Sequence, residues 1–196
     1  MLNEKLLSIS EIEKLLRANH NLNKDEKRDG YNRAGVLIPF FYSDEEWKLL
    51  FTRRTEYVQT HKGQVAFPGG AYDPEDQDIV QTALRESCEE IGLCSNEVKI
   101  LGCLEDQITN SNFSITPVVA YVEKPFNYVI SENEVSRVFC IPLKWLADPE
   151  HRRTEIMTFP DGNENEVIFY QLYDGELVWG VTANIMIKLL DVLNLS

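Results

Sequence analysis

One stretch, residues 69–93, constrains the fold of this chain more than any other. It opens with two adjacent glycines, continues through an acidic loop and then takes on the apolar spacing of a helix. Asp76 or Asp78 can cap the N-terminus of that helix, and Gly92 stands where a left-handed C-terminal cap is expected. The stretch therefore predicts a glycine loop that leads directly into an amphipathic helix.

The two sides of this helix differ in chemistry. At 100° per residue, one side gathers the residues that we expect to face the core, namely Val80, Leu84, Ser87, Cys88 and Ile91. Glu86, Glu89 and Glu90 gather on the other side, where their like charges repel. A Mg²⁺ or Mn²⁺ ion, which prefers oxygen ligands, would supply the counter-charge. Arg85 precedes Glu89 by four residues and can hold its carboxylate in position.

A glutamate-rich helix face is more often simply solvated, and here the glycine loop is what favours a metal site. Residues 85–93 read R-E-S-C-E-E-I-G-L and resemble the signature of the Nudix hydrolases, R-E-U-x-E-E-x-G-U, with U an aliphatic or small residue. Counted from Gly70, the loop is one residue longer than the strict signature, and Asp76 stands where the signature has its first Glu.

The Nudix resemblance implies an α/β fold, specifically an α/β/α sandwich with a mixed β-sheet between helices. It also implies a site in which Glu86 and Glu90 are the main ligands of Mg²⁺ or Mn²⁺. Glu89 would complete the cluster, and the backbone carbonyl of Gly70 would add a ligand. Gly69 and Gly70 lack a Cβ, so the loop can bend tightly and let phosphate groups approach.

Residues 50–70 extend the resemblance and point to one branch of the Nudix family. They read L-F-T-R-R-T-E-Y-V-Q-T-H-K-G-Q-V-A-F-P-G-G, which is similar to the pattern of the coenzyme A pyrophosphatase branch, although Gln59 replaces the usual Arg. The longer loop with Asp76 is also typical of that branch. The resemblance implies metal-dependent hydrolysis of the coenzyme A diphosphate to 3′,5′-ADP and 4′-phosphopantetheine. It does not distinguish free coenzyme A from its derivatives.

Two other functions stay open. One is an ADP-ribose, dinucleotide or other nucleoside-diphosphate-X pyrophosphatase. The other is a Nudix-like module that binds a nucleotide without cleaving it. Such modules commonly lose glutamates of the signature, whereas this chain keeps Glu86, Glu89 and Glu90, which favours catalysis.

Four residues outside the helix are further candidates. Arg53 or Arg54 can hold phosphate groups. His61 lies in the branch motif, where a substrate contact and a structural hydrogen bond are both open. Glu134 lies in an acidic segment that resembles the branch. A glutamate outside the signature often serves Nudix hydrolases as general base or extra metal ligand, but Glu134 is equally compatible with a solvated loop.

Length and charge limit the organisation and the partners. At 196 residues we expect an accessory N-terminal helix and connection over 1–30 and one Nudix domain over 31–196. The net charge of −13 argues against nucleic acid and anionic membranes as partners and leaves a small nucleotide of the coenzyme A type. The segment before the glycine loop is locally basic. A homodimer is left open.

Four cysteines show no metal-binding spacing, and their mostly apolar neighbours predict buried free thiols in a cytoplasmic protein. No signal peptide or long apolar run is evident. Strands are expected over 34–41, 47–53, 98–104 and 113–122, with Pro117 at an edge or a bulge. A hairpin is expected over 154–179, and a final buried helix over 183–195 with Thr182 as its N-cap. Ser10 and Glu13 predict a capping box at the first helix.

Overall fold

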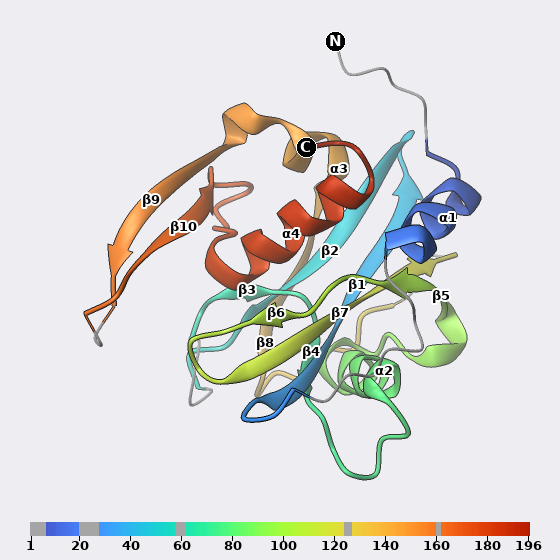
Figure 1. Cartoon of the computed structure of the whole chain (residues 1–196). Coiled ribbons are helices and arrows are strands. Elements are labelled where there is room, and N and C mark those ends of the chain that lie inside the picture. The colour runs from blue at the N-terminus through green and yellow to red at the C-terminus, as the bar shows by residue number, and fades with distance from the viewer. Residues whose placement is uncertain (1–6, 20–27, 58–61, 124–126, 160–161) are drawn as a thin grey trace.

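The computed structural model describes residues 7–19, 28–57, 62–123, 127–159 and 162–196, and an eight-stranded mixed sheet forms its centre (Figure 1). Five strands follow one another as β3 (Val65–Ala66), β2 (Glu46–Arg54), β1 (Asn32–Ser43), β7 (Phe113–Val122) and β5 (Val98–Cys103). Off this path, β4 (Gly69–Ala71) pairs with β1, β6 (Gln107–Ile108) with β7, and β8 (Val135–Pro142) with β2. β1 and β7 run parallel and every other pair is antiparallel. The four predicted strands are confirmed.

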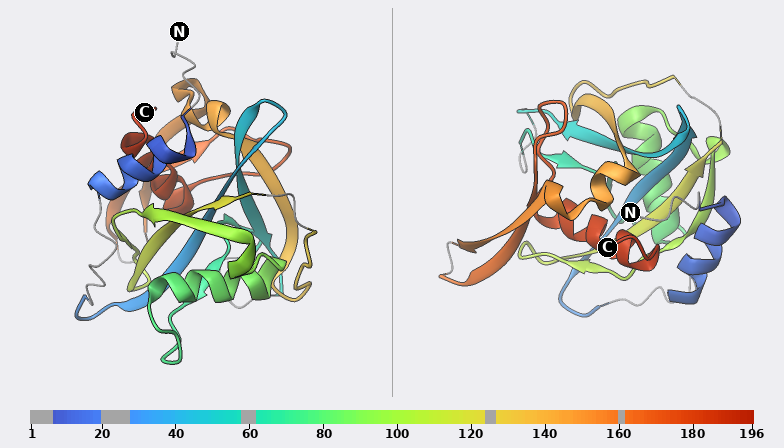
Figure 2. Two further views of the ribbon diagram at one scale, coloured as in Figure 1. Left: turned by 90° about the vertical axis from the view of Figure 1, so that its right-hand side faces the viewer. Right: turned by 90° about the horizontal axis from the view of Figure 1, so that it is seen from above.

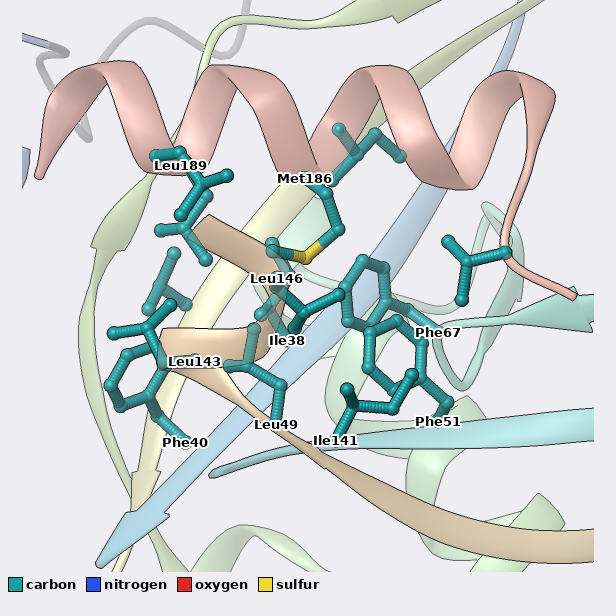
Figure 3. Close-up of a cluster of buried hydrophobic side chains, with 14 of the residues drawn as sticks. Ile38, Phe40, Leu49, Phe51, Phe67, Ile141, Leu143, Leu146, Met186 and Leu189 are labelled. Carbon is teal, nitrogen blue, oxygen red and sulfur yellow. The ribbon is translucent and has the colours of Figure 1, made fainter. Parts of the chain in front are cut away.

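Helices cover both faces of this sheet, as expected for an α/β/α sandwich (Figures 1 and 2). α2 (Ile79–Ile91) lies on one face, and α1 (Ile9–Asn19) and α4 (Gly180–Val192) lie on the other. The short α3 (Leu143–Ala147) follows β8. The apolar side chains of β1, β2 and β8 meet Met186 and Leu189 of α4 in one core, shown in Figure 3. A second core lies under α2 and includes Leu37, Ala83 and Ile91.

The ends of α2 match the sequence prediction. The Oδ1 of Asp78 accepts a hydrogen bond of 2.8 Å from the Gln81 amide, so Asp78 is the N-cap. Gly92 takes a φ of 76° and donates its N–H to the Cys88 carbonyl, which closes the helix with the expected left-handed residue. Local sequence therefore sets where this helix begins and ends.

The buried side of α2 matches the predicted one only in part. Ser87 and Ile91 are fully buried as predicted. Val80, Leu84 and Cys88 are only partly buried, whereas Glu90 is buried. The helix packs closely on β1 at Gly35, where a Cβ would lie 2.6 Å from the Ile79 carbonyl oxygen. This close approach fixes which side of the helix faces the sheet, and helical periodicity alone does not reveal it.

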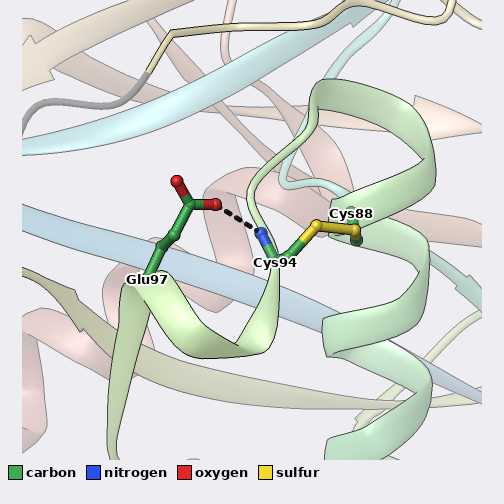
Figure 4. The surroundings of a disulfide bond; sticks show 3 residues. All are labelled: Cys88, Cys94 and Glu97. Carbon is green, nitrogen blue, oxygen red and sulfur yellow. Dashed lines mark hydrogen bonds between the residues drawn. A yellow bond between two sulfur atoms is a disulfide. The ribbon is translucent and has the colours of Figure 1, made fainter.

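A disulfide joins Cys88 and Cys94, which corrects the prediction that all four cysteines are free thiols (Figure 4). The left-handed turn at Gly92 reverses the chain after α2 and brings the two Cα atoms to 4.4 Å from each other. The Cys94 amide also donates to the Glu97 carboxylate at 3.0 Å. Cys103 and Cys140 are free, and Cys103 is buried as expected.

Two further details differ from the sequence prediction. The capping box of α1 is formed by Ser8 and Glu11 rather than Ser10 and Glu13, since the Ser8 amide donates to the Glu11 carboxylate and the Glu11 amide donates to Ser8 Oγ. Helix α4 begins at Gly180, after Trp179, so Thr182 is inside it and donates to the Val65 carbonyl. The N-terminal helix packs on the core, with Ile12 and Leu16 fully buried.

Pro117 lies in an interior strand and in regular register with β1, which corrects the prediction of an edge or a bulge. β1 flanks β7 on one side, and β5 and β6 flank it on the other. The Pro117 carbonyl accepts from the Leu104 amide, beyond the end of β5. Because the N and O of one strand residue face the same neighbour, the missing N–H points to the interval between β5 and β6, where no ladder bond is lost.

The predicted hairpin is confirmed as a separate two-stranded sheet of β9 (Arg152–Thr158) and β10 (Glu164–Tyr170). Single turns of 3₁₀-helix, η1 (Ser95–Glu97) and η2 (Pro149–His151), precede β5 and β9. In the described part of the chain, no helix is long and apolar enough to cross a membrane.

The disulfide should stabilise the fold measurably. Replacement Cys94→Ser opens a loop with a sequence separation of six and should lower the free energy of unfolding by about 2 kcal/mol, because the unfolded chain regains the entropy that the short loop removes. Urea unfolding with and without a thiol reductant measures the effect. The reductant should destabilise the wild type to the level of the variant and leave the variant unchanged. Equal wild-type stability in both conditions would contradict the role of the disulfide.

Candidate functional site

The glycine loop and two glutamates of α2 form the centre of the candidate site. β4 pairs with β1, with Gly70 opposite Gly35 and Gly69 opposite Val36, and this places the loop beside α2. The Gly69 amide donates to Glu90 Oε2 at 3.2 Å. A Cβ at residue 70 would collide with the Glu86 carboxylate. Both glutamate carboxylates therefore lie against the two glycines.

Burial shapes the electrostatics of these carboxylates. Glu90 is 2% exposed, and its Oε1 lies 3.4 Å from Arg54 Nη1. Burial raises the pKa of Glu90 to about 7, although Arg54 and the Gly69 amide favour the charged form. Burial also raises the pKa of Glu86 above its usual range, against the effect of Arg85. For each carboxylate, the protein groups that favour the charged form do not fully offset the effect of burial.

Arg85 links the acidic loop to the glutamates. Its Nη1 donates to Glu86 Oε1 at 2.8 Å and to Glu89 Oε2 at 3.2 Å, so the predicted contact with Glu89 is present. Its Nε and Nη2 donate to the two oxygens of Asp76 at 3.0 and 3.1 Å, and Nη2 also donates to the Ala71 carbonyl. Glu89 itself is largely exposed. Arg85 therefore fixes the loop and the helix in one arrangement.

Asp76 anchors this arrangement, a role that the sequence analysis did not assign. It is buried and also accepts from Thr82 Oγ1 at 2.8 Å and from the Asp73 amide at 3.1 Å. The hydrogen bonds from Arg85 are the main reason why the pKa of Asp76 falls to about 2. The position of Asp76 in the signature was the one sequence signal that could have indicated this anchoring role. Arg85, nine residues later, could have been identified as the partner of Asp76 by searching for a positive charge near this carboxylate.

Glu134 acts electrostatically on the two glutamates. Its charge contributes to the raised pKa of both Glu86 and Glu90, which places it within electrostatic reach. Glu134 is exposed, and its carbonyl accepts from the Thr55 amide at 2.9 Å. The preceding segment is tied to the end of α2, since the Ser131 amide donates to the Glu90 carbonyl. Thr55 and Ser131, which the sequence analysis did not single out, thus position the acidic loop.

Arg53 and Arg54 contact different carboxylates. Arg54 reaches Glu90, whereas Arg53 Nη1 lies 3.6 Å from Glu176 Oε1. Glu176 is buried and also accepts from Arg137 Nη1 at 2.9 Å, a cluster that sequence reasoning missed. The Arg53 side chain is 42% exposed. His61, the remaining candidate, lies outside the described residues.

The donor set fits a hard divalent cation. Glu86 and Glu90 supply carboxylate oxygens, and the glycine loop, which has no room for a Cβ at residue 70, runs beside them. Burial raises the pKa of both carboxylates, and a bound cation would favour their charged forms. Within the ranges that the structure describes, no three Asp, Glu, His or Cys side chains converge tightly enough to form a ready-made metal site.

The Asp76–Arg85 contact predicts a pH-dependent contribution to stability. Because the pKa of Asp76 falls from 3.8 to about 2 on folding, its contribution is complete above pH about 4 and is lost as the pH falls through about 2. Asp76→Asn should lower the free energy of unfolding at neutral pH by about 2 kcal/mol, since charge-assisted hydrogen bonds are lost.

Urea unfolding between acidic and neutral pH measures this difference, with the exposed Glu75→Gln as the control. The gap between the wild type and Asp76→Asn should narrow as the pH falls below about 4. A gap that is independent of pH would show that the charge of Asp76 does not stabilise the loop.

Comparison with known proteins agrees with this geometry. The family model described as NUDIX domain matches residues 31–174 of the chain. An uncharacterized Nudix hydrolase of Yersinia enterocolitica, NudL, is 36% identical over 167 residues, which are 84% of this chain and 83% of the relative. NudL of Yersinia pestis is 36% identical over 154 residues, 79% of this chain and 76% of the relative.

Two solved structures share the fold. A MutT/nudix family protein from Enterococcus faecalis has a TM-score of 0.53 at 15% identity and covers 97% of this chain and 76% of its own. The M. smegmatis Nudix hydrolase RenU has a TM-score of 0.52 at 20% identity and covers 63% of this chain and 78% of its own. The chain therefore belongs to the Nudix hydrolase family, the pyrophosphohydrolases of nucleoside-diphosphate-linked compounds, which generally use divalent metal ions such as Mg²⁺ or Mn²⁺.

Proposed function

We propose that this Nudix hydrolase cleaves the diphosphate linkage of coenzyme A or one of its derivatives. The products would be 3′,5′-ADP and 4′-phosphopantetheine, or its acylated form. The observation that carries the proposal of hydrolysis is the pair of carboxylates, Glu86 and Glu90, held against the glycine loop. The substrate class is supported by the similarity of residues 50–70 to the coenzyme A pyrophosphatase branch.

The proposed metal site uses Glu86 and Glu90 as main ligands, with Glu89 and the carbonyl of Gly70 completing it. When bound, Mg²⁺ or Mn²⁺ would neutralise the diphosphate charge and lower the pKa of a bound water. Arg85 keeps Glu86 and Glu89 in place through its contacts with Asp76. Gly69 and Gly70 leave room for the substrate phosphates.

The acidic loop and the basic strand have separate roles in this proposal. Glu134 would accept the proton of the attacking water, because it is exposed and lies within electrostatic reach of Glu86 and Glu90. Arg53, whose side chain is partly exposed, would hold a phosphate of the substrate. Arg54 contacts Glu90 and would keep that carboxylate charged. His61 stays a candidate substrate contact.

Product analysis tests the proposal. The protein is incubated with Mg²⁺ and then Mn²⁺ against coenzyme A, its thioesters, ADP-ribose and NADH in parallel. Release of 3′,5′-ADP from the coenzyme A compounds alone is the expected result. If AMP release from ADP-ribose or NADH dominates, the substrate is another nucleoside-diphosphate compound and the coenzyme A assignment is wrong. Absence of any cleavage would favour a nucleotide-binding module without catalysis.

Loss of one carboxylate should lower turnover strongly without unfolding the protein. Glu86→Gln or Glu90→Gln should lower kcat by roughly two orders of magnitude or more, because the cation loses a charged ligand. Glu75→Gln, on an exposed glutamate of the same loop, is the matched control and should keep wild-type activity. Far-ultraviolet circular dichroism verifies the fold of each variant. Unchanged turnover in both variants would contradict the proposed ligands.

The two arginines should give different kinetic defects. Arg53→Ala should raise KM for coenzyme A roughly tenfold more than KM for dephospho-coenzyme A, which lacks only the 3′-phosphate, because a charged hydrogen bond to that group is lost. Arg54→Ala should lower kcat for both substrates equally, since Glu90 loses its counter-charge. Steady-state kinetics on this substrate pair separate the two effects. An equal change in KM for both substrates in Arg53→Ala would remove Arg53 from recognition of the 3′-phosphate.

A further inference from the structure

The β9–β10 hairpin projects from the body of the molecule, away from α2 (Figures 1 and 2). It forms its own two-stranded sheet, and within the described ranges it shares no ladder with the eight-stranded sheet. Two-stranded hairpins are only marginally stable in water. Ile156 in the middle of β9 is 70% exposed. The hairpin thus presents an extended and largely solvated strand.

No described residue pairs with the outer edge of β9. Among the described residues, β9 pairs only with β10, and the backbone hydrogen bonds outside the ladders include none from residues 153–157. Backbone groups on such an edge can pair with another strand. Any partner that adds a strand here would extend the hairpin into a larger sheet.

The charges along β9 are self-complementary. In an antiparallel pair of identical strands, the two-fold axis places one residue opposite its own copy. The residue before it then lies opposite the residue after it in the other strand. A two-fold axis at Arg153 would place two arginines opposite each other, and one at Glu155 would place two glutamates opposite each other. An axis at Thr154 opposes two hydroxyl side chains and sets each Arg153 opposite Glu155 of the partner subunit.

We propose that the outer edge of β9 binds a second copy of this chain, antiparallel and centred on Thr154. The two hairpins then form one four-stranded sheet. Arg153 Nε lies 2.6 Å from Glu155 Oε1 within one strand, so the two side chains share a face of the hairpin. Across the two-fold axis they form a ring of four alternating charges. This charge pattern, rather than apolar area, selects the partner and the register.

Two other arrangements compete with this one. Charged residues on an edge strand can serve to prevent association, in which case the protein is a monomer. An axis at Ile156 would oppose two isoleucines and leave Arg153 and Glu155 without crosswise partners. Both alternatives predict that the charges of Arg153 and Glu155 do not promote association.

Sedimentation velocity over a range of protein concentrations tests the proposal. The wild type should dimerise. Arg153→Glu or Glu155→Arg should each weaken dimerisation by about tenfold or more, because each places like charges opposite one another. The matched control is Glu166→Arg on β10, which changes the net charge as Glu155→Arg does and should leave dimerisation unchanged.

Mixing the two single variants separates pairing between chains from effects within one chain. In the mixed dimer, both glutamates of one chain oppose both arginines of the other, although each chain keeps its own like-charge pair. The mixture should dimerise as the wild type does. A monomeric wild type, a dimer that tolerates the single reversals, or a mixture that stays monomeric would each overturn the proposal.

Discussion

The burial of the Glu90 carboxylate is the interaction on which the site depends. A buried carboxylate is costly unless partners surround it, and here the Gly69 amide and Arg54 provide the contacts. These contacts join three separate parts of the chain, namely α2, the glycine loop and the end of β2. Because one pair of oxygens holds all three parts together, the geometry around Glu90 is determined by the packing of the whole domain.

A second network, centred on Arg85, fixes the acidic loop to the same helix. Asp76 takes both the Nε and the Nη2 side of the guanidinium, which leaves Nη1 for Glu86 and Glu89. The residue that departs from the family signature is therefore a structural anchor. Asp76 pairs with Arg85 in a loop that is one residue longer than the strict signature.

The sequence predicts those features that depend on neighbouring residues. The strand positions and the Asp78 and Gly92 caps follow from apolar runs and local hydrogen bonding, and all are present in the structure. The contact of Arg85 with Glu89 follows from helical spacing in the same way.

Features that depend on tertiary packing could not be predicted locally. Gly35 sets the depth at which α2 lies on β1, and this turns Glu90 inward. The Cys88–Cys94 disulfide follows from the chain reversal after Gly92, and Pro117 fits an interior strand because the interval between β5 and β6 faces it. The separation of Arg53 from Arg54 depends on which carboxylates lie nearby, and Glu176 comes from a distant part of the sequence.

The most direct test of the central claim is the binding of Mn²⁺, followed by electron paramagnetic resonance, to the wild type, Glu90→Gln and Glu75→Gln. If Glu90 and the glycine loop form the cation site, Glu90→Gln should weaken Mn²⁺ binding by about tenfold or more, because a charged oxygen ligand is lost. Glu75→Gln should bind as the wild type does. Equal Mn²⁺ affinity in all three proteins would show that the cation binds elsewhere and would contradict the account.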